Sequence, residues 1–222
     1  MGTAIAAAVA TALCAWSVAS GAVRPAEAAV FRFVNGWPDW WRGPLWLFQL
    51  LGVLGMPLLV AAAAAAHRRW RLVMALAALV PLKLLVERDV LKELVARERP
   101  GATVPGAVLR DVPSAGLSFP SGHAVIAFGI VVLLAPHLRR RWVATALVLA
   151  LLNSVSRVYL GAHAPLDVLG GAAAGIAVGS VLNLVVGVPA AADGGPHRSR
   201  RWSGRPRHPG VPARPPPRRG GP

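Results

Sequence analysis

Long runs of apolar residues alternate along the chain with short polar or charged stretches. Six such runs occur, at residues 5–23, 44–66, 72–90, 121–136, 142–160 and 165–188. A helix that crosses a bilayer needs about 20 predominantly apolar residues, and a backbone in lipid must satisfy its own hydrogen bonds. The pattern therefore predicts an all-α fold, a polytopic membrane helix bundle with about six transmembrane helices.

The first run, 5–23, is rich in alanine and is the weakest of the six. A secretory signal peptide begins with basic residues, and no Lys or Arg precedes Arg24. Small residues at 26–29 resemble a cleavage site, so removal of this segment stays an alternative. We expect a retained first helix.

The composition fits a membrane protein and changes sharply near the end of the chain. The chain is 55% hydrophobic and 15% charged, whereas a soluble domain is about 45–50% apolar and about one-quarter charged. The last stretch is rich in Pro, Gly and Arg, which is typical of disorder. We expect a first helix with an extracytoplasmic loop at 1–43, a membrane core at 44–188, and a disordered basic tail at 189–222.

The formal net charge of +15 is compatible with a nucleic-acid partner, but the basic residues follow membrane topology instead. Arg residues gather at 68–71, at 139–141 and in the tail. Basic loops face the cytoplasm, and six spans would put these three groups on one side. We therefore expect a multi-pass protein of the bacterial plasma membrane with a cytoplasmic tail and no nucleic-acid partner. The oligomeric state stays open.

Three polar clusters lie beside predicted helix ends on the opposite, extracytoplasmic side. They cover residues 92–100, 119–123 and 156–167. Charged groups at membrane depth are costly and usually functional. These clusters are therefore the candidate functional site.

Cations and a helix terminus in these clusters indicate a site for phosphate. Lys92, Arg99 and Arg157 supply three positive charges, and the planar fork of Arg matches phosphate oxygens. Ser121 and Gly122 open the fourth predicted helix, where free N–H groups and the helix dipole favour an anion. We expect all five residues to bind phosphate.

Two histidines and a carboxylate add groups for catalysis. His163 lies at the entrance of the sixth predicted helix, and Asp167 follows one turn later. The carboxylate is placed to accept the Nδ1–H of His163, which directs Nε2 outward as a nucleophile. His123 is then the candidate general acid for the leaving group. The sequence has no carboxylate cluster suited to a metal ion, so we expect neither a metal nor a cofactor.

The order and spacing of these residues match a family signature in three parts. The parts read KxxxxxxRP from Lys92, PSGH from Pro120 and SRxxxxxHxxxD from Ser156. Together they resemble the type 2 phosphatidic acid phosphatase superfamily, from about the third predicted helix to the end of the sixth. Six helices also resemble the membrane branch of that family.

This resemblance implies a membrane core similar to type 2 phosphatidic acid phosphatases and haloperoxidases. It implies metal-independent hydrolysis of a lipid phosphate or prenyl diphosphate at the extracytoplasmic face. By the same resemblance, His163 is transiently phosphorylated, Asp167 orients it, and His123 protonates the leaving alcohol. Phosphatidic acid, phosphatidylglycerophosphate and polyprenyl diphosphates are the candidate substrates, and the sequence does not rank them.

Other functions remain as alternatives. Vanadium haloperoxidases hold vanadate in a similar pocket, but these relatives are soluble, and six apolar runs argue against an oxidoreductase. A non-catalytic membrane protein could retain the fold, although the complete set of His123, His163 and Asp167 argues against it. A transporter would place its charges near the midplane, whereas the clusters here lie at helix ends.

Overall fold

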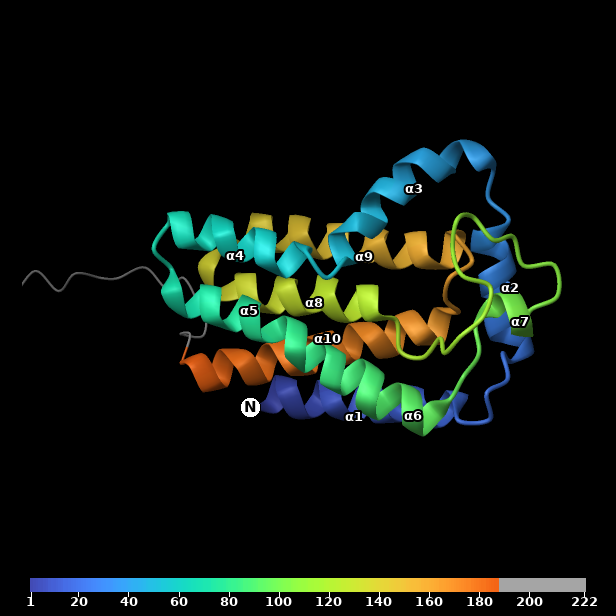
Figure 1. Cartoon of the computed structure of the whole chain (residues 1–222), viewed down its shortest axis with the longest axis horizontal. Coiled ribbons are helices and arrows are strands. Elements are labelled where there is room, and N and C mark those ends of the chain that lie inside the picture. Colours follow the sequence, from blue (N-terminus) through green and yellow to red (C-terminus); the bar gives the residue numbers. More distant parts are fainter. Residues whose placement is uncertain (188–222) are drawn as a thin grey trace, which may run out of the picture. The chain divides into compact units, whose positions relative to one another are not determined.

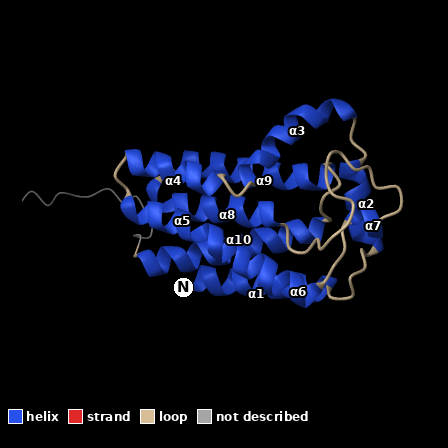
Figure 2. Ribbon diagram, in the orientation of Figure 1, coloured by secondary structure: helices blue, strands red, loops and turns tan. Residues whose placement is uncertain are grey.

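A computed structural model describes residues 1–187 of the chain, and this part is helical. Figure 2 shows helices joined by loops. One isolated β-bridge among these residues pairs Glu98 with Leu117. The all-α prediction is confirmed for this part of the chain. The predicted tail at 189–222 lies outside the described residues.

The bundle consists of helices that run alongside one another (Figure 1). They are α1 (Gly2–Val18), α4 (Met56–Ala66), α5 (Trp70–Leu84), α8 (Gly122–Leu134), α9 (Arg140–Tyr159) and α10 (Pro165–Val186). The α5 helix continues into a π-helical segment, Leu85–Leu91, and then into α6 (Lys92–Val95). The predicted third helix, 72–90, therefore extends further toward the site than its apolar run indicated.

By length and composition, α9 and α10 are each able to cross a membrane. The segments Asp39–Gly52 and Met56–Ala66 form a third candidate if this bent pair is one span. The α1 helix and the stretch Gly122–His137 are shorter apolar helices. The structure thus supports a membrane bundle with a few candidate spans, and the number six stays a prediction.

The second apolar run, 44–66, was expected to form one helix, but it is broken. It contains α3 (Arg42–Gln49), a 3₁₀ turn at Leu50–Gly52 and α4, and the two parts meet at a bend of 66°. Val53 is extended at the break. A Cβ at Gly52 would lie 2.6 Å from the Cβ of His123, so only glycine lets this turn approach α8 so closely.

A helix that the apolar pattern missed lies in the predicted loop at 24–43. The α2 helix (Pro25–Asn35) starts with proline in its first turn, where the missing N–H costs nothing. It buries Glu27, Phe31 and Asn35 on one face. Eleven residues with a polar side are too few for a span, so a search for long apolar runs does not detect such a helix.

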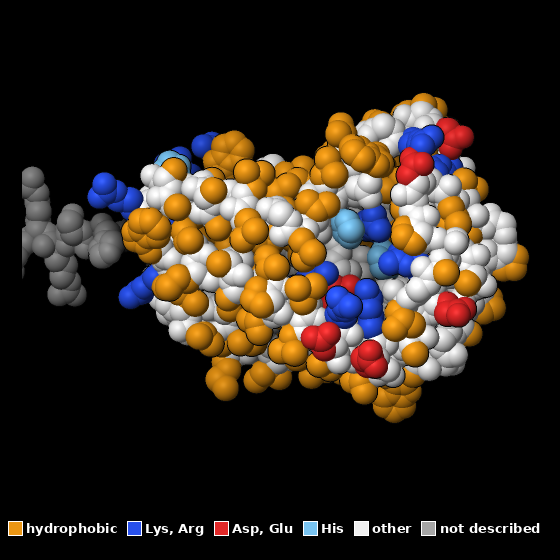
Figure 3. Space-filling model, in the orientation of Figure 1, with side chains coloured by type: hydrophobic (Ala, Val, Ile, Leu, Met, Phe, Trp, Pro, Cys, Tyr) orange, Lys and Arg blue, Asp and Glu red, His pale blue; other side chains and the backbone are white. Residues whose placement is uncertain are grey.

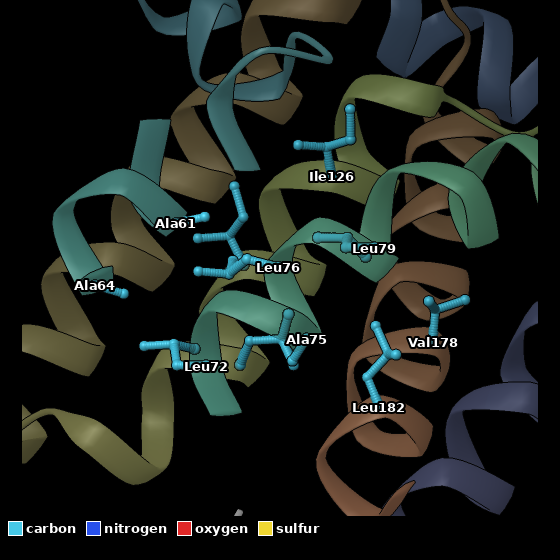
Figure 4. Packing of buried hydrophobic residues seen from close by; sticks show 11 residues of the cluster. Ala61, Ala64, Leu72, Ala75, Leu76, Leu79, Ile126, Val178 and Leu182 are labelled. Carbon is cyan, nitrogen blue, oxygen red and sulfur yellow. The ribbon is translucent and has the colours of Figure 1, made fainter. Parts of the chain in front are cut away.

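A core of small and branched side chains holds the bundle together. Figure 4 shows Leu72, Leu76 and Leu79 of α5 directed toward the neighbouring helices, at the spacing of one helix face. Ile126 of α8 and Leu182 of α10 belong to the same buried cluster. This packing holds α5, α8 and α10 against one another.

Glycines bring α10 against α8 along one stripe. Added Cβ atoms at Gly171 and Gly175 would each lie 2.4 Å from a backbone oxygen of α8 or its cap, that of Ser121 and that of Val125 respectively. Small residues at such a spacing let two helix backbones approach closely in membranes. The stripe therefore sets the position of the start of α8 relative to the start of α10, where the candidate site residues lie.

We predict that Gly175→Ala destabilises the protein by about 2 kcal/mol, because the methyl group meets a backbone oxygen that cannot move away freely. Thermal unfolding of the detergent-purified protein measures the loss. Gly43→Ala is the matched control, since an added Cβ there meets nothing within 4 Å. Equal melting temperatures for the two variants would contradict the proposed close contact.

Candidate active site

A cavity of about 320 Å³ opens at the N-terminal end of α8, beside the break before α4. Figure 3 shows basic, acidic and histidine side chains gathered in a hollow of a mainly hydrophobic face. The charged and histidine residues that line the cavity are Lys83, Glu87, Lys92, Arg99, His123, Arg157 and His163. The structure therefore joins the three sequence clusters in one place.

Six of the eight predicted site residues line this cavity, and the other two lie behind it. The six are Lys92, Arg99, Gly122, His123, Arg157 and His163. The other two, Ser121 and Asp167, have no exposed surface. The N–H of Ser121 donates to the carbonyl oxygen of Asp167 at 2.9 Å, which links the starts of α8 and α10. The hydroxyl of Ser121 is buried and has no hydrogen-bond partner among the described residues.

The first turn of α10 fixes Asp167. Pro165 occupies the first helical position, and the carboxylate of Asp167 accepts the N–H of Ala164 at 2.8 Å. This contact from the third helical residue back to the N-cap N–H is one half of a capping box, and Ala164 has no side-chain oxygen for the other half. It holds the loop that carries His163 close to the helix.

The expected direct hydrogen bond between Asp167 and His163 is absent from the structure. The His163 Nδ1 and Asp167 Oδ2 atoms are 3.9 Å apart. The hydroxyl of Ser118 lies between them, donating to Asp167 at 2.5 Å and lying 3.3 Å from Nδ1 of His163. Ser118 therefore links Asp167 to His163, because the helix cap holds the carboxylate too far from the imidazole for a direct hydrogen bond.

The sequence analysis did not predict Ser118, and Arg97 is a second residue near the site that it missed. Its side chain is fully buried and binds Asp167 at 2.8 Å and Glu27 at 2.6 Å. Burial works against its charge, but the ion pairs with Glu27 and Asp167 outweigh burial and raise the pKa of the guanidinium. The position of Arg97 between Lys92 and Arg99 was a signal in the sequence, yet its carboxylate partners lie on α2 and α10.

Two arginines face the cavity with part of their donors unused. Arg99 Nη1 donates to the carbonyl oxygen of Ala162 at 2.9 Å, and Arg157 Nη1 donates to Gln49 of α3. Within the described part of the chain, the Nε atom of each guanidinium has no partner. These contacts orient the two planar forks, as expected for groups that bind an anion.

His163 is held in its neutral form. Burial first, and then the positive charges of Arg157 and Arg99, lower the pKa of His163 well below its ordinary value. Because the Ser118 hydroxyl donates its proton to Asp167, its oxygen is left to accept the Nδ1–H of a neutral His163, which puts the lone pair on Nε2. The site therefore offers an unprotonated ring nitrogen beside the arginines.

Lys92 has a partner that the sequence analysis did not assign. Its Nζ atom lies 2.6 Å from Glu87, and Lys83 binds the same carboxylate. Among residues 1–187 no group of three or more His, Cys, Asp or Glu side chains is arranged to hold a metal ion.

Comparison with known proteins identifies the family. Residues 69–188, more than half of the chain, match the PAP2 superfamily. The chain belongs to the PAP2 superfamily. This result confirms the resemblance that the three motifs indicated.

Curated relatives share different lengths of the chain. A decaprenylphosphoryl-5-phosphoribose phosphatase of Mycobacterium tuberculosis is 35% identical over 164 residues, which cover 74% of this chain and 83% of that protein. An undecaprenyl-diphosphatase of Sulfolobus acidocaldarius is 38% identical over 39% of this chain and 42% of the relative. A lipid A 4'-phosphatase of Bacteroides thetaiotaomicron is 44% identical over 27% of each protein. The chain thus matches less than half of the length of the last two relatives.

A solved structure supports the same fold. The PAP2-type phosphatidylglycerolphosphate phosphatase of Bacillus subtilis superposes with a TM-score of 0.68 and 26% identity, covering 83% of this chain and 96% of that one. LpxE of Aquifex aeolicus, at 23% identity and a TM-score of 0.55, shares the fold over 69% of this chain and 92% of its own.

We predict that Ser118→Ala lowers kcat by about 10–100-fold and leaves KM nearly unchanged, because His163 loses the contact that fixes its tautomer and orientation. Steady-state kinetics with a lipid phosphate in detergent measures both constants. Ser154→Ala is the matched control: Ser154 is also buried, but its hydroxyl bonds only to the carbonyl oxygen of Ala150 within α9. Equal kinetics for the two variants would exclude the proposed role of Ser118.

Proposed function

We propose that this chain is a metal-independent membrane phosphatase that hydrolyses a lipid phosphate or a prenyl diphosphate through a phosphohistidine intermediate. One observation carries the proposal: the neutral imidazole of His163 faces the same cavity as Arg99, Arg157 and a second histidine, His123. The names of the relatives above, which are phosphatases of lipid-linked phosphates, support the class of substrate.

In the first step, Nε2 of His163 attacks phosphorus and the bond from phosphorus to the leaving oxygen breaks. His123 gives its proton to that oxygen, so that an alcohol leaves, or a lipid monophosphate when the substrate is a diphosphate. Arg99 and Arg157 stabilise the negative charge on the three remaining phosphoryl oxygens. Asp167 and Ser118 stabilise the proton on Nδ1 as the imidazole becomes positive.

In the second step, water attacks the phosphohistidine and the nitrogen–phosphorus bond breaks. His123, now neutral, accepts a proton from that water, which restores the proton it gave in the first step. Inorganic phosphate then leaves, and His163 returns to its neutral form. The cycle consumes one water and needs no redox partner.

We further propose six spans with the cavity at the extracytoplasmic face. Two contacts between basic loops and the far end of the bundle support this orientation. Arg69 donates to the carbonyl oxygen of His137, and Arg71 donates to that of Gly187. These contacts gather basic residues at the end of α8 opposite His123, as the rule for cytoplasmic loops requires.

We predict that the detergent-purified protein releases phosphate in EDTA from one or more of phosphatidic acid, phosphatidylglycerophosphate and a polyprenyl diphosphate. His163→Ala should reduce kcat/KM by about 10³-fold or more, since it removes the nucleophile. His67→Ala, at an exposed histidine outside the cavity, is the matched control. Activity that survives in His163→Ala, or that requires an added metal, would disprove the mechanism.

We predict that His123→Asn slows hydrolysis of a lipid phosphate by about 10²–10⁴-fold. An aryl phosphate with an acidic leaving group needs less protonation, so its hydrolysis should fall much less. Single-turnover rates for both substrates measure the difference. An equal loss for both substrates would show that His123 is not the general acid.

A further inference from the structure

Glu87 is a carboxylate inside a cavity that is otherwise suited to bind an anion. Its side chain lies in the π-helical segment and is only 4% exposed. Among the described residues that line the cavity, Glu87 is the one acid, and Lys83, Lys92, Arg99 and Arg157 line the same cavity. A negative charge there opposes the binding of phosphate, so its presence requires an explanation.

The π-helical turn explains how Glu87 reaches Lys92. In a regular α-helix, residues five apart point about 140° away from each other. A π-helix closes its hydrogen bonds between residues five apart, which brings such residues to the same side. Glu87 and Lys92 are five apart, and their charged atoms lie 2.6 Å from each other. Lys83, one regular turn earlier, binds the same carboxylate.

Glu87 also covers the start of α8. A Cβ at Gly122 would lie 2.5 Å from Oε2 and 2.8 Å from Oε1 of Glu87, so the carboxylate packs directly on the glycine. The first turn of a helix attracts anions through its free N–H groups. Glu87 therefore contacts Lys92 and Gly122, two of the groups expected to bind phosphate.

We propose that Glu87 is a resident anion that competes with phosphate for Lys92 and the start of α8. This inference rests on the proposed phosphate site. When phosphate enters, Lys92 exchanges Glu87 for a phosphate oxygen, and Lys83 retains the displaced carboxylate. When phosphate is the product, the carboxylate returns and weakens the hold of the site on it.

The competition has a clear chemical use. Three fixed cations and a helix terminus would bind inorganic phosphate tightly, and a tightly bound product slows each cycle. A carboxylate that repels the product without touching the arginines lowers product affinity and leaves Arg99 and Arg157 free for the transition state. Glu87 thus adjusts phosphate affinity and is not itself a catalytic residue.

The test measures binding of inorganic phosphate to the full chain in detergent and EDTA, by isothermal titration calorimetry. Glu87→Gln should tighten the dissociation constant by on the order of tenfold, because the competing charge is removed. Lys83→Met should weaken phosphate binding, because Glu87 then keeps only Lys92 as an ion-pair partner and competes more strongly with phosphate for it. Glu93→Gln removes an exposed acid of α6 and should leave the constant unchanged, which controls for long-range charge.

A gain of binding cannot come from a damaged fold, so tighter binding in Glu87→Gln with weaker binding in Lys83→Met supports the inference. If Glu87→Gln does not fold, Glu87→Asp is the second variant. Its side chain is one methylene shorter, so the charge lies further from Gly122 and phosphate binding should also tighten. Unchanged or weaker phosphate binding in Glu87→Gln would overturn the inference and make Glu87 a residue that only positions Lys92.

The same measurement separates this inference from the proposed function. Calorimetry needs no turnover, so tighter binding in Glu87→Gln upholds the competition even in a protein that hydrolyses none of the lipid phosphates. Conversely, the wild-type protein could release phosphate from lipids while Glu87→Gln binds phosphate with unchanged affinity. That result would support the proposed function and exclude the proposed role of Glu87.

Discussion

Arg97 has no exposed surface, and the fold keeps its charge there because two carboxylates meet it. A buried charge without a partner costs several kcal/mol, so the segment that carries Arg97 must lie where Glu27 and Asp167 converge. That requirement ties α2, α10 and the loop after α6 together. It also holds the Asp167 carboxylate, and through Ser118 it holds the imidazole of His163. The position of the His163 imidazole thus follows from two ion pairs of Arg97.

Helix packing supplies the other half of the site. The glycine stripe of α10 brings the starts of α8 and α10 together, so His123 and His163 face one cavity although forty residues separate them in sequence. Both histidines lie near helix N-termini, where backbone N–H groups attract the anion that the side chains would process. Close packing and the geometry of the cavity therefore depend on the same small residues.

The sequence predicted six residues that the structure brings to one cavity, but fewer of the contacts between them. Regular spacing within a motif places Lys92, His123 and His163 at helix ends, and long apolar runs predict most of the bundle. Ser118, Glu27 and Glu87 were missed because their roles come from contacts between distant segments or from a π-helical turn, which no apolar period reveals. The break before α4 depends on the approach of Gly52 to His123, which is a tertiary constraint as well.

Both charged and apolar side chains line the cavity, and this mixture bears on the kind of substrate. Four cations line the cavity, and so do the apolar side chains of Val53, Leu54 and Ile126. Val53 and Leu54 belong to the break before α4, where Val53 is extended, and Ile126 belongs to α8. A free phosphate would contact only the cations. A phosphate joined to a hydrocarbon chain uses both, because its head binds the cations while the first carbons lie against apolar side chains. The break in the second apolar run therefore supports the proposal of an amphiphilic substrate over a soluble one.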